Sequence, residues 1–225
     1  LIFYFDTTTT IANTFHSQPD TANYHTGTTD GISFTETSLI KTHGWDTPPR
    51  KEVGWAIFNI SGMYYNIEVD SIIFNYYVND THDPWWLVVP VNVDPLTSSA
   101  VTVYSDILSG ASTGIPYLNR DEPVEFADSS WYSNMLINGA NDDLENAIAQ
   151  GFFIIGFTEE SWDTTHYLNI DGWAEANPPS LDIYWSMTDG RQGVYRAPAI
   201  PENLIGNPNF ENNRQVSLNT FSSRT

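Results

Sequence analysis

Apolar residues along this chain fall mostly in short runs or alternate with polar residues, which is typical of β-strands. In the stretch SLDIYW, Leu181, Ile183 and Trp185 share one face, and this period of two predicts a half-buried strand. The stretch GFFIIGF shows no alternation, as expected of a strand covered on both faces. Runs rich in Val, Ile, Phe, Tyr and Trp, bounded by turn residues, predict strands at residues 53–58, 70–78, 85–93, 151–157 and 180–185.

Two segments have helical periodicity instead. In DPLTSSAVTVYSDILSG the apolar residues recur at helical spacing, and Gly110 is expected to end the helix. NDDLENAIAQG carries acidic residues in its first turn, where the helix dipole favours them, and Gly151 follows. The sequence predicts helices near residues 97–108 and 142–149. With the strands, they predict a mostly β protein: an antiparallel β-sandwich of the jelly-roll type with two short helices at its ends.

Local composition divides the chain into three parts. Residues 1–30 are expected to form an N-terminal strand and a loop-rich approach, and residues 31–197 the sandwich itself. Residues 198–225 form a tail in which Pro198 and Pro201 mark a hinge before a strand-like segment. Because the chain starts at Leu1 within an apolar run, we expect a processed or trimmed N-terminus.

The charge balance narrows the possible partners. There are 28 acidic and 8 basic residues, which give a net charge of −20. This balance argues against nucleic acid and against anionic membranes, both of which are bound by Lys and Arg. There is no apolar run of about 18 residues, so no membrane span is expected. A strongly negative surface fits a secreted or cell-surface protein, a saline habitat or bound cations, and a chain without cysteine forms no disulfides.

Enzyme motifs fail in their sequence context. GASTG (110–114) has the G-x-S-x-G pattern, but a predicted helix precedes the serine where a strand is required. The five His residues show no metal-ligand spacing. We therefore expect a noncatalytic protein. A glycan-acting enzyme stays open as an alternative, because it needs only a suitably spaced carboxylate pair from among Glu159, Glu160, Asp171 and Glu175.

Tryptophans near predicted loops suggest a carbohydrate-binding surface. Flat aromatic rings beside polar side chains can stack on sugars, and such rings can equally cover the ends and edges of a sandwich. The hypothesis names two candidate platforms. One pairs Trp85 with Trp86, and the other combines Trp173 with Asp171 and Glu175.

A structural calcium ion is a further possibility, because Ca²⁺ prefers carboxylate and carbonyl oxygens and the chain is rich in carboxylates. YLNIDG resembles part of an EF-hand loop but has Tyr167 and Pro178 at the first and twelfth positions, so it fails as one. An irregular site is the remaining hypothesis. Its candidate ligands are Asp80, Asp83, Asp94, Asn169 and Asp171.

The order of these segments resembles a known group of domains. FNIS (58–61) follows a predicted strand, a helix–Gly–strand unit lies in the middle, and PPSLDIYW (178–185) closes the pattern. Over roughly residues 30–186 the chain resembles the jelly-roll sandwiches of secreted surface proteins, of the DNRLRE and carbohydrate-binding-module kind. THYLNIDGWAEAN stands in the place of their arginine-containing signature. The resemblance implies an exported, noncatalytic module used for attachment.

The two ends suggest how such a protein could act. An apolar start and a strand-like tail could add strands to a neighbouring copy, because an open sheet edge accepts an extra strand. Pairing within the same chain is the equal alternative. The principal hypothesis is a structural or adhesive surface protein such as a filament subunit that assembles by exchange of terminal strands, and the alternative is a carbohydrate-binding module. The candidate assembly residues are Leu1, Ile2, Phe3, Tyr4, Phe5, Val216, Leu218 and Phe221.

Overall fold

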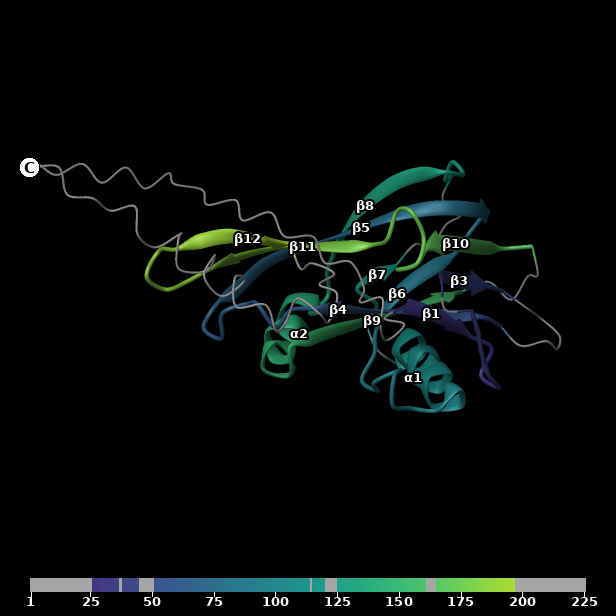
Figure 1. Ribbon diagram of the computed structural model, residues 1–225, viewed down its shortest axis with the longest axis horizontal. Coiled ribbons are helices and arrows are strands. Elements are labelled where there is room, and N and C mark those ends of the chain that lie inside the picture. The colour runs from purple at the N-terminus through teal and green to yellow at the C-terminus, as the bar shows by residue number, and fades with distance from the viewer. Residues whose placement is uncertain are drawn as a thin grey trace, which may run out of the picture.

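The computed structural model describes residues 26–36, 38–44, 51–113, 115–119, 125–160 and 165–196. These residues form two antiparallel sheets of six strands each, packed face to face as a sandwich, with two α-helices (Figure 1). The predicted fold class is confirmed.

The first sheet, sheet A, lies next to both helices. Its centre is the pair β4 and β9, which are buried along nearly their whole length. β9 carries the GFFIIGF run, so the lack of alternation in that run did indicate a strand covered on both faces. In order across the sheet, the strands are β2 (Phe34–Glu36), β1 (Thr26–Thr29), β4 (Val53–Asn59), β9 (Phe152–Glu159), β6 (Trp86–Pro90) and β7 (Leu118–Asn119).

The second sheet, sheet B, is built around the long strand β5. Its path is β12 (Gln192–Arg196), β11 (Ser180–Ser186), β5 (Glu68–His82), β10 (Tyr167–Asp171) and β3 (Leu39–His43), and β8 (Ser130–Leu136) pairs with β5. The order β3-β10-β5-β8 faces the order β4-β9-β6-β7. This arrangement is the eight-strand, double-Greek-key jelly roll.

The stretch from Tyr167 to Trp185 is one interrupted strand. β10 pairs with the Val78–His82 end of β5, and β11 continues along β5 from Asn75. The intervening residues leave the ladder as a short loop that begins at Gly172. A Cβ atom there would overlap the Ser38 carbonyl, so the residue type is set by close backbone approach.

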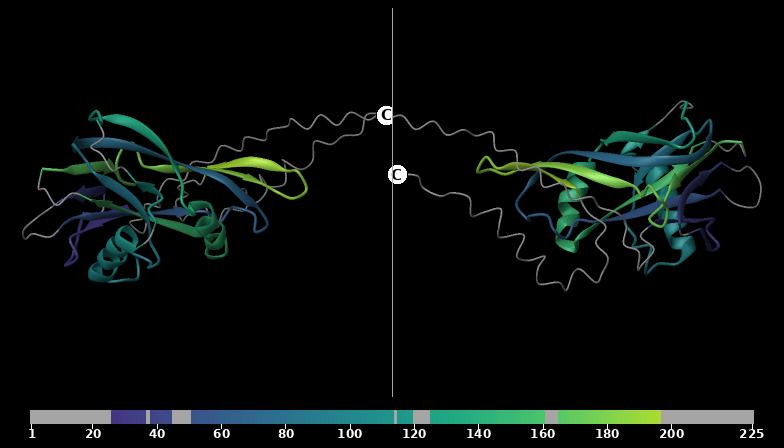
Figure 2. Two further views of the ribbon diagram at one scale, coloured as in Figure 1. Left: turned by 180° about the vertical axis from the view of Figure 1, so that it is seen from behind. Right: turned by 45° about the horizontal axis from the view of Figure 1, so that its top comes forward.

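Two apolar clusters lie on opposite faces of sheet A. The larger one fills the space between the sheets and includes Phe58, Phe74 and Trp86. The smaller one lies under α1 (Ala100–Thr113), which packs on the outer face of sheet A (Figure 2). α2 (Ala140–Ala147), followed by a short 3₁₀ turn (Ile148–Gln150), buries Leu144 against the larger cluster. Within the described residues, no helix is long and apolar enough to cross a membrane.

Several predicted boundaries are wrong. α1 begins at Ala100 and continues past Gly110. A Cβ at Gly110 would lie 2.8 Å from the Pro90 carbonyl oxygen, so this glycine allows the helix to approach β6 and does not end it. α2 begins two residues earlier than expected, at Ala140.

Strand limits also differ from the prediction. β5 runs through the expected turn at 79–84 as far as His82, because β10 pairs with it there. β6 ends at Pro90, whereas the prediction ran to residue 93. β1 pairs with β4 inside the segment that was predicted to be a loop-rich approach, so the sheet begins before residue 31.

Candidate functional site

The structure separates the two rings of the proposed Trp85–Trp86 platform. Trp86 is fully buried and lies between the rings of Tyr76 and Phe157 in the main core. Trp85 is half-buried and contacts the ring of His166. Because neighbouring residues entering a strand point to opposite faces, the two indoles cannot form one surface. The predicted platform is therefore not formed by this pair.

The second proposed platform lies in the loop between β10 and β11. Asp171 is buried, and its two carboxylate oxygens accept hydrogen bonds from the side-chain amides of Asn79 (2.9 Å) and Asn177 (3.2 Å). Trp173 is half-buried and its backbone N–H donates to the Thr26 hydroxyl, while Glu175 is exposed. The carboxylate of Asp171 thus holds the loop to β5 and does not face solvent beside Glu175.

Replacing Asp171 with alanine is expected to destabilise the fold by about 2–3 kcal/mol, because two part-buried hydrogen bonds to its carboxylate are lost together. Urea denaturation measures the loss. Glu175→Ala is the matched control, since its side chain is exposed, and it should change stability by less than about 0.5 kcal/mol. Equal effects of the two substitutions would contradict the structural role of Asp171.

The candidate calcium ligands do not form one group. Asp80 and Asn169 are paired across β5 and β10, whereas Asp94 lies on the far side of sheet A, just before α1. Asp94 accepts hydrogen bonds from the Leu96 N–H and the Thr97 hydroxyl, as a turn residue does. The backbone carbonyl of Asp83 contacts His166. Among the described residues, no cluster of three or more His, Cys, Asp or Glu side chains could hold a metal ion.

The remaining sequence candidates lie outside the described residues. These are the assembly residues Leu1–Phe5, Val216, Leu218 and Phe221. Their roles stay predictions.

The open edge of sheet B is a feature that the site prediction did not include. β8 has seven residues and is the longest of the strands at the edges of either sheet; within the described part of the chain it pairs with β5 alone. Trp131, Met135 and Ile137 on and just after it are 54%, 53% and 48% exposed. The chain has no charged residue between Asp128 and Asp142. Such an edge, without Lys or Pro, can accept a further strand.

Another edge strand of sheet B, β3, is protected. On β3, the Lys41 backbone N–H donates to the Thr28 hydroxyl (2.8 Å), and that hydroxyl donates to the Leu39 carbonyl (3.2 Å). One side chain from β1 therefore satisfies two backbone groups that an added strand would need. Comparison of β3 with β8 shows that the fold closes the edge of β3 and leaves that of β8 accessible among the described residues.

A second polar feature is buried at one end of the sandwich. Glu159, at the end of β9, is fully buried, and the Thr42 hydroxyl donates to its Oε2 (3.4 Å). Burial raises the pKa of Glu159 to about 8, although the Trp85 backbone N–H and the charge of Lys51 oppose the rise. Burial likewise lowers the pKa of Lys51 to about 8, against the attraction of Glu159 and Glu160.

Glu159 and its neighbour Glu160 are not arranged as the two carboxyl groups of a glycoside hydrolase. Retaining or inverting glycoside hydrolysis needs two carboxyl groups on either side of an accessible sugar. Glu159 is inaccessible, whereas its neighbour Glu160 is exposed, because the two residues point in opposite directions at the end of β9. Glu159 and Lys51 instead affect the stability of the fold and the way this stability changes with pH.

The sequence analysis missed the open edge of β8 and the burial of Glu159 for different reasons. In SWYSNML, Trp131, Ser133 and Met135 alternate with Tyr132 and Leu136, so the strand period was visible. The Glu159–Thr42 contact joins residues 117 positions apart and leaves no local pattern.

A scan of protein-family models and a search of curated proteins find no match to this chain. What it shares with the domains that its sequence resembles is the two-sheet antiparallel β-sandwich.

Proposed function

We propose that this chain is a noncatalytic structural or adhesive protein of an extracellular surface, and that its copies associate through the open edge of β8. The observation that carries the proposal is the seven-residue, uncharged edge strand with three exposed apolar side chains. An added strand would gain main-chain hydrogen bonds and cover Trp131 and Met135 at the same time.

The charge distribution supports a second copy as the partner. Two chains of net charge −20 repel each other, and the repulsion is weakest where the contacting segments carry no charge, as between Asp128 and Asp142. Association through one edge, with repulsion elsewhere, favours ordered assembly over clumping. The candidate donor strands remain Leu1–Phe5 and residues 215–221.

The positions of the candidate acids support a noncatalytic role. Glu159 and Asp171 are buried, and their neighbours Glu160 and Glu175 are exposed, so neither Glu159 with Glu160 nor Asp171 with Glu175 presents two carboxylates to one cleft. The charge and the resemblance to secreted jelly-roll modules support an extracellular location.

Lysine on the edge strand is expected to abolish self-association. Met135→Lys and Trp131→Lys place a charge beside the backbone that an incoming strand would pair with, and its burial would be costly. Sedimentation velocity and electron microscopy of the full chain should show concentration-dependent assemblies that both substitutions convert to monomers. Tyr184→Lys is the matched control, because Tyr184 is 40% exposed on the same sheet but on an interior strand.

Two outcomes would refute the proposed assembly. One is a full chain that stays monomeric at the highest concentrations reached. The other is assembly that survives Met135→Lys as well as it survives Tyr184→Lys. If β8 is the acceptor, separate deletions of residues 1–6 and 198–225 then identify which end donates the strand.

A further inference from the structure

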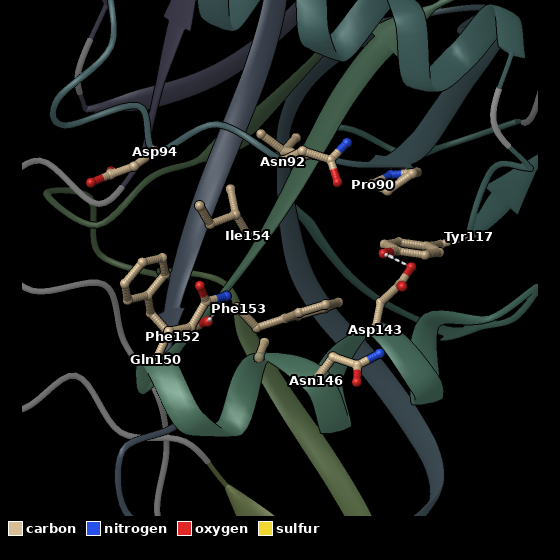
Figure 3. A pocket seen from close by; sticks show the side chains of 12 residues that line it. Pro90, Asn92, Asp94, Tyr117, Asp143, Asn146, Gln150, Phe152, Phe153 and Ile154 are labelled. Carbon is tan, nitrogen blue, oxygen red and sulfur yellow. Dashed lines mark hydrogen bonds between the residues drawn. The ribbon is translucent and has the colours of Figure 1, made fainter.

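A pocket of about 320 Å³ opens on the helix-bearing side of sheet A. One wall is the connection from β6 toward α1, including Pro90 and Asn92, and the opposite wall is α2 and the turn after it (Figure 3). The first residues of β9 form the floor between them. Its volume is at the small end of the range for ligand pockets, roughly 300–1,000 Å³, and suits one or two sugar rings.

The floor of the pocket is aromatic and aliphatic. Phe152 is half-buried and Ile154 lies beside it on the same face of β9. At the other end of the pocket, the ring of Phe153 stacks with that of Tyr117, with centroids 6.0 Å apart. Apolar C–H groups of a ligand could therefore rest on the floor while its polar groups reach the walls.

The walls carry amides that are free to bind. Asn92 on one wall and Asn146 on the other are exposed, and neither side chain makes a hydrogen bond to the described residues. Gln150 donates from Nε2 to the Phe152 carbonyl (3.2 Å), which fixes the amide and leaves its oxygen available. Each amide can both donate and accept, as a hydroxyl-bearing ligand requires.

Local hydrogen bonds hold these walls in place. The Asp106 carboxylate on α1 accepts from the backbone N–H of Asn92 (2.6 Å) and Val93 (3.3 Å), which ties the β6–α1 connection to the helix. On the other side, the Tyr117 hydroxyl donates to Oδ2 of Asp143 (2.6 Å). Burial and this bond raise the pKa of Tyr117, so it stays a donor. A pocket shaped before binding loses less entropy when a ligand enters.

The chemistry of the lining selects the class of ligand. No Lys, Arg or His is among the pocket residues within the described part of the chain, while Asp94 and Asp143 are acidic, so an anion would be repelled. The described residues offer no group of three metal-ligating side chains, so a metal ion is disfavoured. The exposed amides disfavour a purely apolar ligand, because covering them without partners is costly.

We propose that this pocket binds an uncharged saccharide. Phe152 contacts the C–H face of a sugar ring, Asn92 and Asn146 bind hydroxyl groups from opposite walls, and Oδ1 of Asp143 accepts a further hydroxyl. This site is separate from the tryptophans that the sequence suggested and from the β8 edge.

Calorimetric and NMR titrations of the full chain with cellobiose, maltose, lactose and N,N′-diacetylchitobiose test the proposal. At least one of these neutral disaccharides should bind, and Asn146→Ala and Asn92→Ala, one on each wall, should each weaken its binding about tenfold. Gln192→Ala is the matched control, because Gln192 is an exposed amide on sheet B, and it should leave binding unchanged. Thermal unfolding of each variant verifies that α2 stays folded.

Binding should also discriminate against charge. Digalacturonate should bind at least tenfold more weakly than the best neutral disaccharide, since the carboxylates of ligand and pocket repel each other. Failure of all four neutral sugars to bind would overturn the proposal, and so would binding that is insensitive to both wall substitutions. Met135→Lys should keep sugar binding, so failure of the assembly proposal is distinguished from failure of this one.

Discussion

Replacing Trp86 with alanine is expected to lower the free energy of unfolding by about 3–5 kcal/mol. The indole is fully buried between the two sheets, where it packs edge-on to Tyr76 and stacks with Phe157. Its removal would leave a cavity that several rings line, and aromatic rings held by both sheets cannot collapse into it. Urea denaturation followed by circular dichroism measures the loss.

Two further substitutions make this test specific. Trp86→Phe keeps most of the ring volume and should cost far less than the alanine substitution. It also removes an indole N–H that has no hydrogen-bond partner among the described residues. Trp131→Ala also removes an indole ring, but from the exposed side of β8, and should change stability by less than about 1 kcal/mol. A Trp86→Ala protein as stable as Trp131→Ala would show that the ring is not part of the core.

The strands were predictable where local pattern and burial agree. Leu181 and Ile183 face the core, as their alternation indicated, and β9 is covered on both faces, as its continuous apolar run indicated. Boundaries failed where a distant segment decided them. β5 continues to His82 because β10 pairs with it, and that pairing is invisible from residues 79–84 alone.

The predicted Trp85–Trp86 platform failed for a reason that the sequence did contain. Trp85 and Trp86 are adjacent at the start of a predicted strand, so their side chains had to point to opposite faces. One of the two rings therefore had to lie in the core, and this ring is that of Trp86. The exposed tryptophan with apolar neighbours is Trp131, whose alternation with Tyr132 was readable in the sequence but was not used.

The pocket could not have been found from the sequence. Asn92 and Asn146 stand on segments more than fifty residues apart and are ordinary exposed amides in their own surroundings. They face one pocket because α2 and the β6–α1 connection both pack beside the start of β9. Exposed amides have no periodic signature, so only the tertiary fold identifies them.

The native chain is expected to lose stability as the pH rises from about 5 to about 8, and substituting Glu159 with glutamine should remove a large part of this loss. In the folded protein the pKa of Glu159 is raised to about 8, chiefly by burial, from an ordinary value of 4.5. Between these values the folded state keeps a proton that the unfolded state has lost, so stability falls with rising pH. A difference of this size corresponds to a decrease on the order of 3–5 kcal/mol, complete above the folded pKa.

The buried lysine titrates in a different window. The pKa of Lys51 is lowered from 10.5 to about 8, so its contribution changes only above about pH 8, where stability rises with pH. Measurements from pH 5 to pH 8 therefore isolate the carboxyl group from this amine. Glu160 acts on both groups, but its side chain is exposed, and Glu160→Gln is the matched control.

Urea denaturation at pH 5 and at pH 8 measures the free energy of unfolding of the native chain, Glu159→Gln and Glu160→Gln. Glutamine keeps the shape of the buried side chain and its contact with Thr42, so Glu159→Gln should be close to the native chain in stability at the acidic end. At the alkaline end it should be clearly more stable, because an amide cannot ionise in the unfolded chain as the native carboxyl group does. Glu160→Gln should follow the native curve. If Glu159→Gln instead loses stability with pH as steeply as the native chain, the carboxyl group is ionised throughout, and Lys51 must stabilise its charge more strongly than burial opposes it.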